Sequence, residues 1–216
     1  MKEFILFDLD GTLTNPELGI TRSIQYALKA FQIIEPKLED LRKYIGPPLR
    51  DSLQEFNGFD ASQAEEAVAK YREYFVKTGI FENEVYEGIE TLLEGLCRAG
   101  KTLLVATSKP EEFARRILEH FGLEAYFTDV CGATMDASRD SKEAVIRYAL
   151  EKNQITDLTS AVMVGDRLHD IEGAKSAGIA SIGVLFGFGS RSELEEAGAD
   201  RIAGTVEELY QIIMEM

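Results

Sequence analysis

The strongest constraint on the fold is a series of short apolar runs separated by helix-like segments. The runs are FILF, TLLVAT, TDVCG, SAVMVG and IASIGVLF. Strands that are apolar throughout occur where helices cover both faces of a parallel sheet, because side chains on both faces are then buried. The segments between the later runs have apolar residues at helical spacing, as in residues 141–152. This alternation predicts an α/β core built on a parallel sheet with helices on both faces.

Residues 15–84 interrupt the alternation. Four amphipathic segments follow one another there without a convincing strand between them: TRSIQYALKAF, KLEDLRKY, RDSLQEF and AEEAVAKYREYFVK. We therefore expect a helical domain inserted between the first strand and the rest of the core. The predicted domains are 1–14 with 85–216 for the core and 15–84 for the insertion, joined through the turns TNPE and FENEVYEG.

Composition narrows the classes of function. The chain of 216 residues is long enough for one sizeable core with a smaller second domain. Its 38 acidic and 23 basic residues give a formal charge of −15, which argues against binding to nucleic acid or to anionic membranes, since both use basic patches. A small anionic ligand at one local site is compatible with that charge.

The chain has no feature typical of a membrane or secreted protein. A strand pattern begins within three residues of the start, so we expect no leader peptide. No apolar run approaches the roughly 18 residues of a membrane helix. Cys97 and Cys131 are too few for a disulfide framework or a zinc site, and we expect both thiols to be buried and inert. These features predict a cytoplasmic protein and leave its oligomeric state open.

Two strings that match or approach nucleotide-binding motifs lack the required context. GLCRAGKT, residues 95–102, fits the P-loop pattern, but it closes a predicted helix and enters a strand. A P-loop follows a strand and opens a helix, so that backbone N–H groups face the phosphates. GFGSRS, residues 187–192, lacks the third glycine of the dinucleotide-binding pattern. We expect neither string to bind a nucleotide cofactor.

Polar residues directly follow three of the predicted strands. Asp8 and Asp10 follow FILF, Thr107 and Ser108 follow LLVA, and Asp166 follows AVMVG. Open α/β sheets bind ligands at the carboxyl ends of their strands, and right-handed crossovers bring those ends to one edge. The alternative is that these residues only cap the helices that follow.

Electrostatics favours a ligand site over helix caps. Residues two apart in a strand point to one face, so Asp8 and Asp10 can face the same volume. Asp166 and Asp170 lie four apart where a turn becomes a helix, and are potential neighbours as well. Like charges at such spacing repel by about 0.2–0.5 kcal/mol when exposed, and by more in a cleft. A divalent cation reverses that repulsion, and carboxylate oxygens suit Mg²⁺.

Lys142 adds evidence of a different kind. It lies in the first turn of the helix predicted from residue 141, with Asp140 or Ser141 as the N-cap. A cation is disfavoured at the positive end of a helix, and it becomes useful there if an anion lies in front of it. The alternative is a solvated surface lysine.

Together these stretches resemble the four motifs of the haloacid dehalogenase-like superfamily of hydrolases, in order and across the whole chain. The matching features are DLDGT after an apolar strand, a threonine ending the next core strand, a lysine before a later helix, and GDRLHD after the following strand. The resemblance implies a Rossmann-like core. The insertion resembles the small α-helical cap of phosphoglycolate phosphatases and β-phosphoglucomutases. The tail GVLFGFGSRSELEEAGAD is most similar to the phosphoglycolate phosphatase and bacterial 5′-nucleotidase-like branch.

For Asp8 and Asp10 the resemblance implies the chemistry itself. Asp8 would attack phosphorus to form an aspartyl-phosphate, and Asp10 would protonate the leaving oxygen and then activate water. The side chain of Asp8 and the backbone carbonyl of Asp10 would also bind Mg²⁺. An acid–base carboxylate at Asp10 favours phosphoryl transfer over carbon–halogen cleavage.

The resemblance implies binding roles for the other matched residues. Thr107, with Ser108 beside it, would bind the transferring phosphoryl group, and Lys142 would stabilise its charge. Asp166 and Asp170 would hold the metal directly or through water. Positioning and charge neutralisation of this kind account for most of phosphoryl-transfer catalysis.

The predicted activity is that of a Mg²⁺-dependent phosphatase acting on a small phosphorylated metabolite. A sugar phosphomutase of the same superfamily is one alternative, and a catalytically dead phosphate-binding or protein-interaction module is another. In the insertion, the turn IGPPLRD, residues 45–51, could offer Arg50 to a second anionic group of the substrate, or it could be an ordinary helix connector. The sequence assigns no role to His169 and does not identify the substrate.

Overall fold

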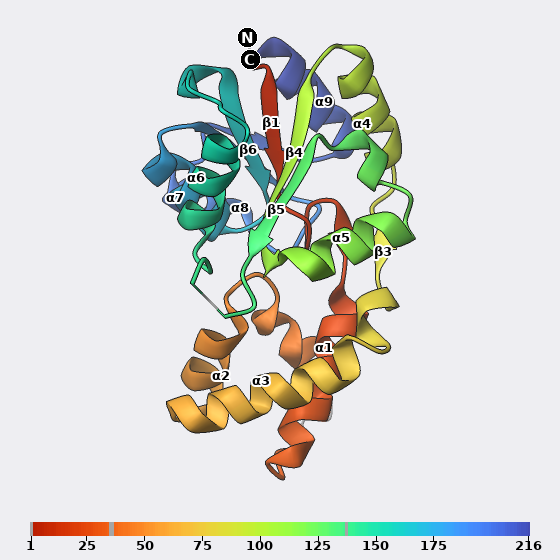
Figure 1. The fold of residues 1–216 in the computed structure, drawn as a ribbon, viewed down its shortest axis with the longest axis vertical. Helices are drawn as coiled ribbons and strands as arrows, with labels where there is room; N and C mark the ends of the chain where they lie inside the picture. Colours follow the sequence, from red (N-terminus) through yellow and green to blue (C-terminus); the bar gives the residue numbers. More distant parts are fainter. Residues whose placement is uncertain (1, 35–36, 137) are drawn as a thin grey trace. The chain divides into compact units, whose positions relative to one another are not determined.

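The computed structural model describes residues 2–34, 37–136 and 138–216, which form two compact units. One unit is Pro16–Glu84, and the other combines Met1–Asn15 with Val85–Met216. The larger unit contains a six-stranded sheet in the order β5-β4-β1-β6-β7-β8. Figure 1 labels the four strands β5, β4, β1 and β6 of this sheet. Neighbouring strands pair in parallel throughout this sheet. Its strands are β1 (Phe4–Phe7), β4 (Thr102–Pro110), β5 (Asp129–Ala133), β6 (Ala161–Gly165), β7 (Ala180–Val184) and β8 (Arg201–Ala203).

The first strand of the chain, β1, lies in the middle of the sheet. Phe4 pairs with Thr102 of β4 on one side and with Ala161 of β6 on the other, and the register continues to Phe7. Residues 5–7 are fully buried. Because both neighbours run parallel to β1, the residues after Phe7 leave the sheet at the same edge as those that follow β4 and β6.

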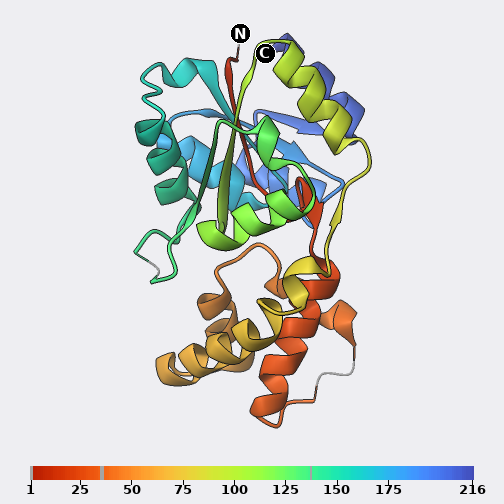
Figure 2. The ribbon, with the colours of Figure 1, turned by 45° about the vertical axis from the view of Figure 1, so that its right-hand side comes forward.

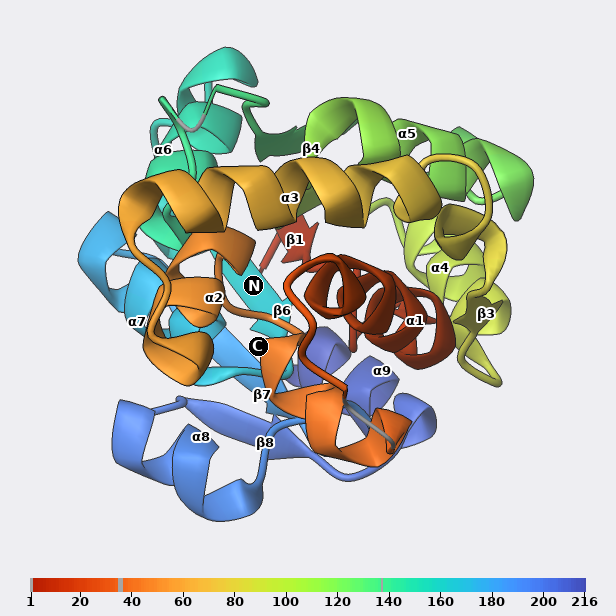
Figure 3. The same ribbon diagram turned by 90° about the horizontal axis from the view of Figure 1, so that it is seen from below.

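Helices cover both faces of the sheet, which confirms the predicted fold class. Helices α6 and α7 pack on one face, and α4, α5 and α9 on the other. Figure 3 shows α6 and α7 on one side of the strands and α4 and α9 on the other. A buried apolar cluster that includes Leu104, Val145 and Met163 fills the space under α6 and α7. The helices of this unit are α4 (Ile89–Arg98), α5 (Glu111–His120), α6 (Lys142–Lys152), α7 (Leu168–Ala177), α8 (Arg191–Ala197) and α9 (Val206–Glu215), with single turns of 3-10 helix at η3 (Glu124–Tyr126) and η4 (Leu158–Ser160).

The smaller unit is helical (Figure 2). Asp60 caps its longest helix, α3, by accepting the backbone N–H of Gln63 at 2.8 Å, while the Gln63 side chain accepts the N–H of Asp60 at 3.1 Å. Two short strands, β2 (Thr14–Asn15) and β3 (Glu84–Val85), pair where the chain passes between the units. The helices are α1 (Glu17–Ala30), α2 (Leu49–Asn57) and α3 (Ala61–Phe75), with 3-10 helices η1 (Leu38–Tyr44) and η2 (Gly79–Phe81).

Some details differ from the expectations of the sequence. The segment KLEDLRKY forms the 3-10 helix η1 instead of an α-helix. Strand β8, which has only three residues and lies at the sheet edge, is not predicted from the sequence. Cys131 is buried as expected, but Cys97 is exposed, because it lies near the end of α4 away from the buried face of that helix.

Two further observations concern the P-loop-like string and the lengths of the helices. Residues 95–102 run from the end of α4 into β4, so the P-loop-like string has the wrong order of elements for phosphate binding. Within the described ranges, none of the helices combines the length and the apolar character needed to cross a membrane.

Candidate active site

Three carboxylates meet at the carboxyl edge of the sheet, and we call them the acidic cluster. Asp8 directly follows β1, Asp166 directly follows β6, and Asp170 lies in the first turn of α7. One oxygen atom from each lies within 4.8 Å of those from the other two. All three residues are buried. The structure thus brings together three of the four residues that the sequence predicts as metal ligands.

Lys142 joins the acidic cluster from α6. Its Nζ lies 2.8 Å from Asp8 Oδ1 and 2.8 Å from Asp170 Oδ1, and it donates to the Ala106 carbonyl at 3.1 Å. Ser141 caps α6, which puts Lys142 at the first helical position. Burial lowers the pKa of Lys142, but the nearby carboxylates of Asp170 and Asp8 outweigh it, so that the pKa is raised overall. The Lys142 ammonium group thus lies buried between two carboxylates, which favour its charged form.

A second buried cation, Lys109, is not predicted by the sequence pattern. Its Nζ lies 2.7 Å from Asp10 Oδ2, and both side chains are largely buried. Thr107, two residues earlier on β4, accepts the backbone N–H of Lys109 at 3.2 Å with its Oγ1. The available signal was a lysine two residues after the predicted phosphate-binding threonine, in the stretch TSKP.

The formal charge of this site is −2, because four carboxylates face two ammonium groups. Burial raises the pKa of Asp10, although Lys109 opposes the rise. Burial, together with the charges of Asp170 and Asp8, raises the pKa of Asp166 well above its usual value. Burial likewise raises the pKa of Asp170 to about 6, against the effect of Lys142. The two lysines therefore leave the carboxylates incompletely neutralised. The charged groups counted are Asp8, Asp10, Asp166, Asp170, Lys109 and Lys142.

The donor atoms of the site fit a divalent cation. Asp166 Oδ2 accepts the Phe188 N–H at 2.8 Å, whereas Asp166 Oδ1 is buried and has no hydrogen-bond partner among the described residues. A buried charged oxygen without a partner is costly unless a cation binds it. Two positive charges would cancel the formal charge of the site, and hard oxygen donors suit Mg²⁺. The acidic cluster would hold such an ion.

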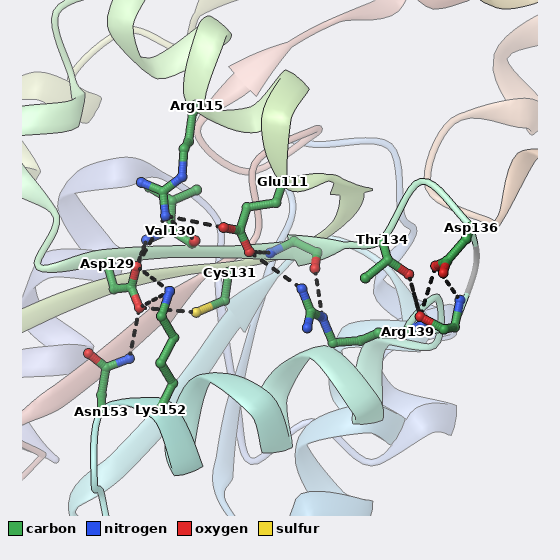
Figure 4. Close-up of polar contacts among 12 residues, drawn as sticks. Glu111, Arg115, Asp129, Val130, Cys131, Thr134, Asp136, Arg139, Lys152 and Asn153 are labelled. Carbon is green, nitrogen blue, oxygen red and sulfur yellow. Dashed lines mark hydrogen bonds and ion pairs between the residues drawn. The ribbon is translucent and has the colours of Figure 1, made fainter.

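Arg139, three residues before Lys142, contacts several neighbouring elements. Figure 4 shows the Arg139 side chain directed towards Glu111, with Thr134 close to the Arg139 backbone. The Arg139 Nε donates to the Gly132 carbonyl at 3.0 Å, and its Nη2 lies 3.4 Å from Glu111 Oε2. The guanidinium carbon also lies 3.6 Å from the centre of the Tyr148 ring. Contacts with β5, α5 and α6 thus hold the Arg139 side chain, three residues before the start of α6.

The remaining predicted residues have more varied surroundings. Thr107 is buried near the end of β4, and Ser108 beside it is half-buried. Arg50 lies in α2 of the smaller unit and pairs with Glu65, so its contact with a substrate stays a prediction. His169 is half-buried in the first turn of α7, where burial lowers its pKa.

The fold and the residues at its carboxyl edge agree with a known class of enzyme. Residues 5–184 match the family described as haloacid dehalogenase-like hydrolase, and the chain belongs to that family. The family predicted from the four sequence motifs is therefore confirmed.

Individual relatives are similar over nearly the whole chain. A 5′-nucleotidase from Pseudomonas aeruginosa is 46% identical over 209 residues, which cover 97% of this chain and 94% of the relative. The tyrosine-protein kinase PtkA from Mycobacterium tuberculosis is 39% identical over 214 residues, which cover 98% of this chain and 72% of PtkA. The crystal structure of a predicted phosphatase from Clostridium acetobutylicum is 47% identical, covers 100% of both chains and has a TM-score of 0.98. The nucleotidase and the phosphatase agree with the predicted enzyme class, a phosphoric monoester hydrolase.

Proposed function

We propose that the chain is a Mg²⁺-dependent phosphatase that hydrolyses a small phosphomonoester through an aspartyl-phosphate on Asp8. The observation that carries the proposal is that the two carboxylates after β1 pair with different buried lysines, Asp8 with Lys142 and Asp10 with Lys109. Carboxylates in different electrostatic surroundings can take different roles, here nucleophile and acid–base. The nucleotidase relative and the sequence resemblance support a 5′-nucleotidase-like or phosphoglycolate phosphatase-like substrate.

Asp8 provides the nucleophile. A carboxylate oxygen of Asp8 attacks phosphorus, and the bond from phosphorus to the leaving oxygen breaks. Lys142, 2.8 Å from Asp8 Oδ1, orients the carboxylate and offsets negative charge as the phosphoryl group approaches. The Thr107 hydroxyl donates a hydrogen bond to a phosphoryl oxygen, and Ser108 lies next to Thr107. When bound, Mg²⁺ would neutralise charge on the phosphoryl group.

Asp10 moves the protons in both steps. Burial raises its pKa, so the side chain can hold a proton closer to neutral pH and donate it to the leaving oxygen. The carboxylate that results is stabilised by Lys109 at 2.7 Å. It then accepts a proton from the water that attacks phosphorus and breaks the bond to Asp8, which releases inorganic phosphate.

Phosphate release from a panel of small phosphomonoesters tests the proposal. With Mg²⁺, the wild type should release phosphate from nucleoside monophosphates, phosphoglycolate or sugar phosphates, and EDTA should abolish the reaction. Asp8→Asn should stop turnover, whereas Asp157→Asn, at an exposed carboxylate that caps a 3-10 turn, should leave it unchanged. The values of kcat/KM rank the substrates. Turnover without metal, or an active Asp8→Asn variant, would refute the proposal.

The same panel separates the alternatives. A sugar phosphomutase would move phosphate to a second position of the sugar without releasing it. A dead phosphate-binding module would bind inorganic phosphate and turn over no compound of the panel. One further reaction mixture contains ATP and a tyrosine peptide, because PtkA, which is named a tyrosine-protein kinase, is 39% identical to this chain. Transfer of phosphate to tyrosine in preference to water would contradict a hydrolase.

We also propose that the helical unit Pro16–Glu84 is the cap that selects the substrate, with Arg50 binding a second anionic group. The Arg50 side chain pairs with Glu65, while its Nε is buried and has no hydrogen-bond partner in the described part of the chain. Arg50→Met should raise KM for phosphoglycolate, which has a second anion, more than for p-nitrophenyl phosphate, which has none. Equal effects on the two substrates would contradict this role.

A further inference from the structure

The connection between β7 and α8 touches the acidic cluster through a backbone group. The N–H of Phe188 donates to Asp166 Oδ2 at 2.8 Å, and the other carboxylate oxygen, Oδ1, has no hydrogen-bond partner in the described ranges. The peptide group therefore fixes the rotation of the carboxylate and leaves one oxygen for a ligand. This connection contains the stretch GFGS, which has no role in the proposed chemistry.

The glycines on either side of Phe188 allow this close approach. A Cβ atom on Gly187 would lie 2.5 Å from Asp166 Oδ2 and 2.2 Å from the Gly11 carbonyl oxygen. A Cβ atom on Gly189 would lie 1.9 Å from the Asp166 carbonyl oxygen. Contacts this short are excluded in a close-packed interior, so a side chain at either position would push the connection away from Asp166.

Glu193, in the first turn of α8, contacts the two residues that follow Asp166. Its Oε1 accepts the backbone N–H of Leu168 at 2.9 Å and the Arg167 Nε at 2.8 Å. The Leu168 N–H belongs to the first residue of α7, so Glu193 satisfies one of the free donors at the start of that helix. Asp170 follows in the same turn. The segment from Gly187 to Glu193 thus contacts Asp166 and the start of α7, where Asp170 lies.

We propose that segment 187–193 is a positioning element that sets the affinity of the acidic cluster for a divalent cation. It acts through the Phe188 N–H on Asp166 and through Glu193 on the start of α7. When a group that hydrogen-bonds to a metal ligand and orients it is removed, the affinity for the metal commonly falls by about 10-fold to 100-fold. The inference rests on the proposed function, since it needs the acidic cluster to bind the metal.

A matched pair of variants isolates the backbone donor. Phe188→Pro removes the N–H, and Phe188→Ala keeps it while removing the ring. Binding of Mg²⁺ is measured by calorimetry without substrate, after circular dichroism has shown that each variant is folded. Phe188→Pro should weaken Mg²⁺ binding by about 10-fold to 100-fold, and Phe188→Ala should stay within about 2-fold of the wild type. Equal Mg²⁺ affinities for Phe188→Pro and Phe188→Ala would overturn the inference.

A second pair keeps the inference testable if Phe188→Pro does not fold. Gly187→Ala places a methyl group against Asp166, whereas in Gly204→Ala the nearest atom is the flexible end of Glu208, at 3.1 Å. Gly187→Ala should weaken Mg²⁺ binding and Gly204→Ala should not, and equal affinities would again count against the positioning role. A wild type that binds no Mg²⁺, or Asp166→Asn that binds it equally well, would instead contradict the proposed metal site.

Discussion

In the metal-free protein the free energy of unfolding should fall as the pH rises. The buried carboxyl groups then lose their protons, and no cation compensates the negative charge that forms. Burial raises the pKa of Asp10, Asp166 and Asp170. A carboxyl group whose pKa is higher in the folded than in the unfolded state binds its proton more tightly when folded. Its contribution to stability is complete below the unfolded pKa and is lost as the pH rises through the folded pKa.

Asp170 gives the magnitude of the effect. Its pKa rises from an ordinary value of 3.8 to about 6 in the folded protein. Each pKa unit corresponds to about 1.4 kcal/mol, so the full contribution is roughly 3 kcal/mol. About 2 kcal/mol of that lies between about pH 4.5 and about pH 7.5. Asp10 and Asp166 act in the same direction. The loss is measurable against a total stability of about 5–15 kcal/mol.

Urea unfolding followed by circular dichroism, from about pH 4.5 to about pH 7.5, measures the effect. In EDTA the free energy of unfolding should fall with increasing pH, and Asp170→Asn should remove about 2 kcal/mol of that fall. With excess Mg²⁺ the fall should disappear, because the cation binds the deprotonated carboxylates. A metal-free profile that is flat or rising would refute the reasoning, and so would equal slopes for the wild type and Asp170→Asn.

Three further substitutions have defined outcomes. Lys142→Met removes the cation of the acidic cluster and should lower the free energy of unfolding in EDTA by about 3–5 kcal/mol; an unchanged urea midpoint would contradict a buried ion pair. Lys109→Met should move the alkaline limb of the pH profile of kcat/KM up by about one to two units, because Asp10 must be protonated to donate to the leaving oxygen and Lys109 opposes the rise in its pKa. Lys109→Arg is its control and should keep the limb near the wild-type position. Leu104→Ala, at a fully buried position of β4, should destabilise the protein by about 2–5 kcal/mol in urea titrations and leave KM unchanged.

The acidic cluster could be predicted from the sequence because two of its members directly follow apolar runs. In a parallel sheet the chain leaves each strand at the same edge, so this position is enough to bring Asp8 and Asp166 together. Lys142 stood out because its charge conflicts with the dipole of its helix. The structure resolves that conflict with two carboxylates, each at 2.8 Å.

Other features carry too little sequence signal. The Phe188 N–H is a backbone group, so no residue type marks it as a partner of Asp166. Lys109 becomes distinctive only when the sheet brings β4 beside β1 and hence beside Asp10. Strand β8 has three residues, too few to show a pattern. The 3-10 helix Leu38–Tyr44 is so short that its period cannot be told from that of an α-helix.

The central place of β1 has a consequence for the order in which the chain matures during synthesis. Its partners, Thr102 in β4 and Ala161 in β6, are translated long after Phe4. The unit Pro16–Glu84 is continuous in sequence, so all of its residues have emerged before β1 can pair. Because domains generally fold as units during translation and distant pairing is slow, we expect the inserted unit to fold first on the ribosome. Chains stalled so that residues 1–101 have left the ribosome should then protect residues 16–84 from protease while β1 is still unpaired. Protease sensitivity of residues 16–84 in such chains would contradict this order.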